Sequence, residues 1–128
     1  MNSQQLTKWI QDKIKEARLA QDMVSRAIDE VEARAIAASE AERKAEVQYS
    51  TAYLKSEQGT ERSKEADAKL HAADLRHEMR VCKALHHSAQ AAEKKARDDA
   101  MLVMRELEAA RTIAATMRLE ESIGRHET

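Results

Sequence analysis

The chain has 128 residues, and 22 basic against 23 acidic side chains give a formal net charge of −1. Pro and Phe are absent and Gly occurs only twice, which excludes a β-rich or mixed domain built on tight turns and aromatic strands. The balanced charge excludes a generally basic nucleic-acid binder, so any electrostatic function must come from local patches.

Apolar residues recur every seven positions in the first part of the chain. Alternating spacings of four and three indicate the seam of a coiled coil, and they predict a first helix over about residues 3–57. The leading row of the seam is Ile10, Ala17, Val24, Val31, Ala38, Ala45 and Ala52. Its companion row, four residues on, is Ile14, Gln21, Ile28, Ala35, Glu42 and Tyr49.

The phase of this pattern breaks at the only internal glycine, so a turn is predicted over about residues 58–60. Gly59 is expected to take the left-handed conformation that ends a helix. Thr60 is expected to cap the next helix, with Glu61 in its first turn. A single helix bent at Gly59 is the alternative, because one Gly in a helix costs only about 1 kcal/mol.

A second seam predicts a helix over about residues 61–123, with Gly124 as its stop signal. Its leading row is Ala68, Leu75, Cys82, Ala89, Ala96, Val103, Ala110 and Met117. Its companion row is Ala72, Met79, His86, Glu93, Ala100, Leu107 and Ala114. The predicted fold is therefore all-α, a single-domain antiparallel helical hairpin.

Alanine at so many seam positions predicts a thin core, because Ala has little surface to bury. Larger apolar residues lie off these rows and widen the apolar face: Trp9, Leu19, Met23, Leu70, Leu85, Met101, Leu102 and Ile113. A wide apolar face favours a further layer of helices. The sequence thus predicts self-association, as a dimer that forms a four-helix bundle.

Residues that could carry chemistry have a simpler structural interpretation here. Met79, Cys82 and His86 share one helical face, but structural zinc requires four ligands in close pairs. His86 and His87 are adjacent, so their side chains diverge by about 100° and do not easily share one site. Gly-rich phosphate loops and a pocket for nucleophilic catalysis are not indicated. No enzyme activity, metal or cofactor is expected.

One basic stripe is a candidate nucleic-acid contact. Its members follow a helical spacing of 0, 4, 7 and 11 and are Arg76, Arg80, Lys83 and His87. Such a stripe can lie along a phosphate backbone. The favoured alternative is a solvated face that pairs with acidic residues of the first helix, such as Asp29, Glu30 and Glu32.

The segment from Tyr53 to Ala66, YLKSEQGTERSKEA, resembles the junction between two long helices in small all-helical bacteriophage and prophage early-region proteins. The later segment from Glu106 to Ile113 is similar to the closing part of that pattern. Gln58 stands as an additional residue between Glu57 and Gly59. The resemblance implies a setting near phage recombination or replication functions, and it implies no functional residues.

The functional expectation is a non-catalytic, phage-encoded helical adaptor that acts through itself and other protein partners. Two alternatives remain: a nucleic-acid-binding accessory in recombination or replication, and an inhibitor of a host defence system or enzyme. A single Cys, a polar start and the lack of a long apolar run predict a cytoplasmic protein without membrane association. In a phage setting this would be the cytoplasm of the host cell.

Overall fold

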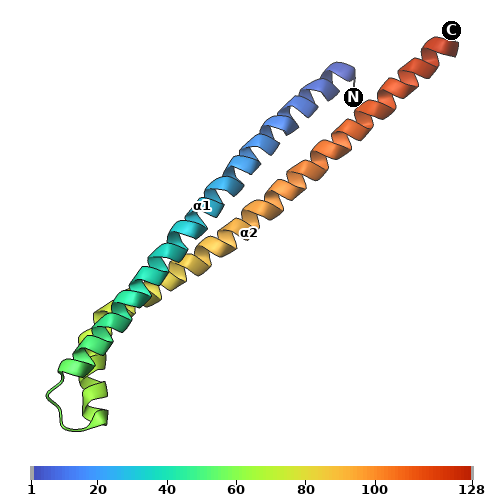
Figure 1. The fold of residues 1–128 in the computed structure, drawn as a ribbon. Helices are drawn as coiled ribbons and strands as arrows, with labels where there is room; N and C mark the ends of the chain where they lie inside the picture. Colours follow the sequence, from blue (N-terminus) through green and yellow to red (C-terminus); the bar gives the residue numbers. More distant parts are fainter. Residues whose placement is uncertain (1, 128) are drawn as a thin grey trace. The chain divides into compact units, whose positions relative to one another are not determined.

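The computed structural model describes residues 2–127, with side chains described as far as Gly124, and all its regular structure is helical. Two helices follow one another, α1 at Ser3–Lys55 and α2 at Glu61–Glu127 (Figure 1). Asn2 caps α1, because its Oδ1 accepts a hydrogen bond from the Gln5 amide at 2.8 Å. The Gln5 side chain accepts one from the Asn2 amide at 3.0 Å, which completes a reciprocal capping box.

The turn between the helices spans residues 56–60, so α1 ends two residues before the expected boundary. Thr60 caps α2: its Oγ1 accepts a hydrogen bond from the Ser63 amide at 3.2 Å. Glu61 lies in the first turn of α2, where a carboxylate is favoured by the helix dipole. The expected left-handed conformation of Gly59 is wrong, because neither glycine has a positive φ.

The expected stop at Gly124 is also wrong, because α2 continues to Glu127. Glycine in a helix costs only about 1 kcal/mol relative to Ala, and it ends a helix only where the chain adopts a C-cap conformation. Gly124 has no positive φ, so the helical hydrogen-bond pattern passes through it.

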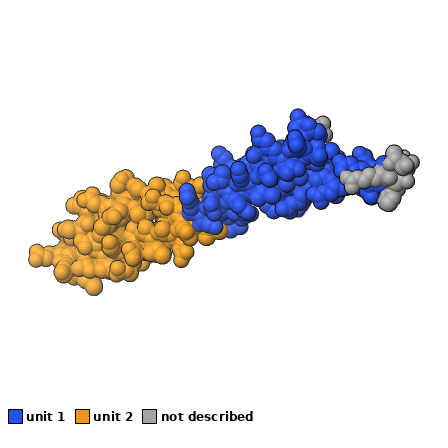
Figure 2. Space-filling view, turned by 90° about the horizontal axis from the view of Figure 1, so that it is seen from above, with its two compact units in different colours: residues 1–26, 93–128 blue, residues 27–92 orange. Residues whose placement is uncertain are grey.

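The chain divides into two compact units (Figure 2). Unit 1 contains residues 1–26 and 93–128, and unit 2 contains residues 27–92. Within each unit a segment of α1 packs on a segment of α2 that runs in the opposite direction. The bent-helix alternative at Gly59 is therefore wrong, since the chain reverses and the two helices pack as a hairpin in unit 2.

The core of both units is made mainly of alanine. Ten of the thirteen buried apolar residues in the described chain are Ala. The exceptions are Leu6, Val24 and Leu107. Ala68, Ala72 and Ala110 are fully buried, and no large side chain among the described residues is. The helices therefore meet through small side chains, which contribute little hydrophobic stabilisation for each residue.

The predicted rows of α2 are confirmed as the packed seam, because none of the fifteen positions is exposed. The leading row of α1 is confirmed in the same way. The companion row of α1 is confirmed only in part: Gln21 and Ile28 are exposed, whereas its other four members, Ile14, Ala35, Glu42 and Tyr49, are half-buried. The row three residues on from the leading row is covered throughout: Leu6, Lys13, Ala20, Ala27, Arg34, Ala41 and Gln48. A row of period seven can be continued by a step of three or of four.

The molecule exposes 9784 Å² of accessible surface. A folded monomer of 14.5 kDa is expected to expose only roughly 6,900 Å². Neither described helix contains a stretch long and apolar enough to cross a membrane.

Candidate interaction surfaces

The basic stripe lies on α2 within unit 2. Two of its four side chains contact residues of α1. The guanidinium of Arg76 lies over the ring of Tyr49, with 4.6 Å between its Cζ and the ring centroid. Lys83 Nζ lies 3.4 Å from Glu42 Oε1. Arg80 and His87 are exposed. Glu42 of α1 therefore offsets the charge of Lys83, and the ring of Tyr49 covers Arg76.

A groove of about 460 Å³ runs beside the stripe and carries both signs of charge. Its lining residues are Glu42, Ala45, Glu46, Tyr49, Ser50, Arg76, Met79 and Arg80. The expected acidic partners were wrong in position, since the inter-helix pair uses Glu42 and not Asp29, Glu30 or Glu32. Carboxylates this close to the basic groups oppose the approach of a phosphate backbone.

The Met79, Cys82 and His86 face belongs to the packed seam, and all three side chains are half-buried. No group of three or more His, Cys, Asp or Glu side chains in the described residues is arranged to hold a metal ion. The rings of His86 and His87 stack with centroids 6.0 Å apart, although His86 is half-buried in the seam and His87 is exposed.

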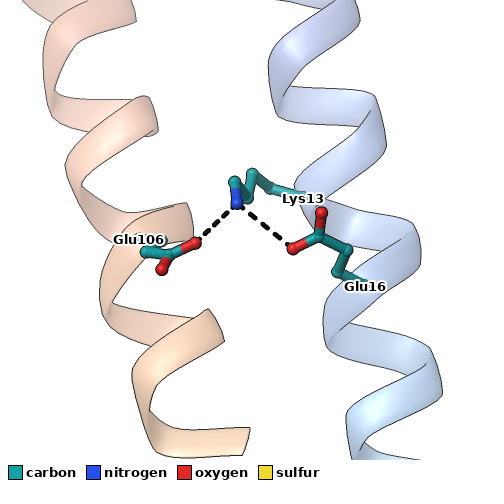
Figure 3. A network of polar contacts seen from close by, with 3 residues as sticks. All are labelled: Lys13, Glu16 and Glu106. Carbon is teal, nitrogen blue, oxygen red and sulfur yellow. Dashed lines mark hydrogen bonds and ion pairs between the residues drawn. The ribbon is translucent and has the colours of Figure 1, made fainter. Parts of the chain in front are cut away.

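Unit 1 contains a polar cluster that the sequence pattern did not reveal. Lys13 Nζ bonds Glu106 Oε2 on α2 at 2.5 Å and Glu16 Oε2 on its own helix at 3.2 Å (Figure 3). The Lys13 side chain is only 17% exposed. The hydrogen bond to Glu106, followed by that to Glu16, raises the pKa of Lys13 above its usual value of 10.5. Lys13 therefore stays charged and links the two helices.

The sequence pattern did not indicate Lys13, because Lys13 lies three residues after Ile10 and the predicted companion row begins four residues after it. Its row contains Ala20, Ala27 and Ala41, and this run of small residues is the signal that could have identified it. A lysine in such a row can extend its apolar stem over the seam while its ammonium group reaches a carboxylate.

Two further grooves lie side by side on unit 1, along one edge of its seam. The first, of about 470 Å³, is lined by Ile14, Ala17, Arg18, Gln21, Asp22, Met104, Leu107 and Arg111. The second, of about 380 Å³, is lined by Gln21, Val24, Arg97, Ala100, Met101 and Met104. They share Gln21 and Met104, so they adjoin, and together they are called the apolar channel below. Its charged lining is Arg18, Arg97 and Arg111 against Asp22.

Large apolar side chains on the outside are the most pronounced surface feature. Among the residues whose side chains are described, fourteen large apolar ones are more than a third exposed: Leu19, Met23, Ile28, Ile36, Val47, Leu54, Leu70, Val81, Leu85, Met101, Leu102, Ile113, Leu119 and Ile123. Seven of the eight residues that the sequence placed off the seam are among them, and Trp9 is half-buried. The buried core is thus mostly alanine, and most of the large apolar residues predicted beside the seam are exposed.

No protein-family model, curated protein sequence or solved structure matches this chain. The resemblance at the Tyr53–Ala66 junction therefore stays a prediction, and function must be argued from the surfaces themselves.

Proposed function

We propose that this protein is a non-catalytic helical interaction protein that works as a homo-oligomer and binds other proteins through its helix faces. The single observation that supports it most is the inverted distribution of apolar residues, with alanine in the seam and fourteen large side chains outside. Isolated exposed apolar residues are ordinary on a protein surface, but so many on a two-helix scaffold favour burial against further helices.

The surface area supports the same proposal. The excess over a typical monomer is roughly 2,900 Å², and stable protein interfaces bury about 1,200–2,000 Å² in total. Two helices that meet through alanine bury little apolar surface alone. Burial of part of the excess surface against a second copy adds to this core.

The oligomer is tested by sedimentation velocity and light scattering over a series of protein concentrations. The expected result is a mass of at least twice 14.5 kDa. A particle that stays monomeric at every concentration would overturn the proposal. A pulldown from bacterial lysate then distinguishes an adaptor from an inhibitor, since an inhibitor should retain one host enzyme or defence protein as its main partner.

The nucleic-acid accessory is the second candidate, because Arg80 and His87 of the basic stripe are exposed. The pairing of Lys83 with Glu42 weighs against it. Fluorescence anisotropy of labelled single- and double-stranded DNA decides between the two at low and moderate salt. Binding that weakens steeply with salt signals phosphate contacts and would place this candidate first, whereas no binding at low salt would remove it.

A further inference from the structure

Unit 1 has two sides of opposite charge, separated by its helix seam. With Ile10 of α1 and Ala72 of α2 as heptad position a, positions e and b lie on one side of the seam and positions g and c on the other. The contacts follow this division. Ile14, Met104 and Arg111, all at position e, line one groove, whereas Glu16 and Glu106, both at position g, share Lys13.

The first side, here the basic face, has five basic residues and one acidic residue at positions e and b: Arg18, Lys94, Arg97, Arg111 and Arg118 against Glu108. Arg97 bonds Glu93 at 3.2 Å, which offsets part of its charge. The apolar channel lies within this face, with Ile14 and Met104 half-buried along it. The basic face therefore combines an apolar floor with a positive rim.

The second side, here the acidic face, has five acidic residues and two basic residues at positions g and c: Asp12, Glu16, Asp99, Glu106 and Glu120 against Arg26 and Lys95. With Lys13 counted, the acidic groups still outnumber the basic ones by five to three. Five exposed large apolar residues of the described chain accompany them: Leu19, Met23, Leu102, Ile113 and Ile123. The acidic face thus combines exposed apolar side chains with an excess of negative charge.

We propose that the basic face of one copy binds the acidic face of a second copy. This inference rests on the proposed homo-oligomer and specifies its interface. The exposed Leu and Met side chains of the acidic face enter the channel between Ile14 and Met104, while Arg18 and Arg111 meet Asp12 and Asp99. Opposite charge selects this arrangement, because like-charged juxtaposition across an interface costs several kcal/mol.

Pairing of one face with its own copy is disfavoured for the same reason. A two-fold dimer through the basic face would bring two sets of arginines together, and a dimer through the acidic face would bring two sets of carboxylates together. A contact between two different faces is heterologous, so each copy binds one neighbour on either side. Such contacts close into a ring or continue as a linear assembly.

The test uses two variants of the full chain. The first, Arg18→Glu with Arg111→Glu and Arg118→Glu, leaves two basic and four acidic residues at positions e and b, so both faces are acidic. The second, Asp12→Lys with Asp99→Lys, makes both faces basic. Each alone should self-associate at least about tenfold more weakly than the parent chain. An equimolar mixture should recover the association, because every contact in it joins faces of opposite charge.

The matched control is Lys15→Glu with Asp98→Lys, which reverses two charges at position f, away from both faces. Its association should equal that of the parent chain. Circular dichroism at 222 nm establishes that each variant is folded before sedimentation is measured.

Two outcomes would overturn the inference, and they are distinguishable. If the parent chain associates but the mixture of reversed variants does not, the interface is elsewhere and the homo-oligomer still stands. If the parent chain is monomeric throughout, both the interface and the proposed function fail.

Discussion

Replacement of Ala72 by Leu tests whether the space between the two helices accepts only a side chain as small as that of alanine. Ala72 and Ala68 lie one turn apart on α2 in unit 2, and both are fully buried. Ala72 lines none of the three grooves described above. A larger side chain at this position must therefore push the two helices apart or leave its preferred rotamer.

The expected cost is about 1–3 kcal/mol, the usual range for overpacking in a well-packed core. For a chain of this length, 1 kcal/mol corresponds to roughly 3–6 °C in the midpoint of thermal unfolding. Urea unfolding followed by circular dichroism measures the effect directly, at one fixed protomer concentration because self-association raises apparent stability.

The matched control is Ala73→Leu, one residue along the same helix at an exposed position. It introduces the same side chain and nearly the same helix propensity, and it should change the free energy of unfolding by less than about 0.5 kcal/mol. Equal effects at the two positions would refute the reasoning. Stabilisation by Ala72→Leu would refute it more strongly, since it would mean that the seam has room and gains from added apolar area.

Three further predictions concern contacts between and at the ends of the helices. Because the folded-state pKa of Lys13 is raised above 10.5, its stabilising contribution is complete below that pH and lost as pH rises through the folded value. The stability of the parent chain relative to Lys13→Met should thus fall on going to higher pH, and a constant difference would contradict this. Tyr49→Leu should lower the free energy of unfolding by about 0.5–1 kcal/mol, because it removes the ring beneath Arg76. Tyr49→Phe keeps the ring and should change the free energy of unfolding little. An equal loss in both variants would mean that the hydroxyl group, and not the ring, stabilises the fold. Thr60→Ala should lower stability by about 1 kcal/mol through loss of the α2 cap, and Thr60→Ser should not; no change in urea midpoint for Thr60→Ala would rule out the cap.

The sequence predicted the fold correctly where apolar residues recur every seven positions. The α2 rows were correct because a seven-residue repeat of Ala, Leu, Val and Met leaves one stripe that can be buried. In α1 a step of four placed Ile28 in the companion row, whereas the structure covers Ala27 and leaves Ile28 exposed. Which step is covered depends on the partner helix, which the pattern of one helix does not contain.

The contacts at the surfaces depended on register between the helices, which the sequence leaves undetermined. Whether Lys83 meets Glu42 or Glu32 depends on how far α2 slides along α1, and the turn at residues 56–60 sets that distance. A shift of about one heptad, roughly 10 Å along a helix, keeps the apolar rows in contact but exchanges every charged partner. Charge sorting into two faces is less sensitive, because it follows from heptad position alone. The proposed contact between copies therefore depends on the heptad positions of the charged residues, which such a shift does not change.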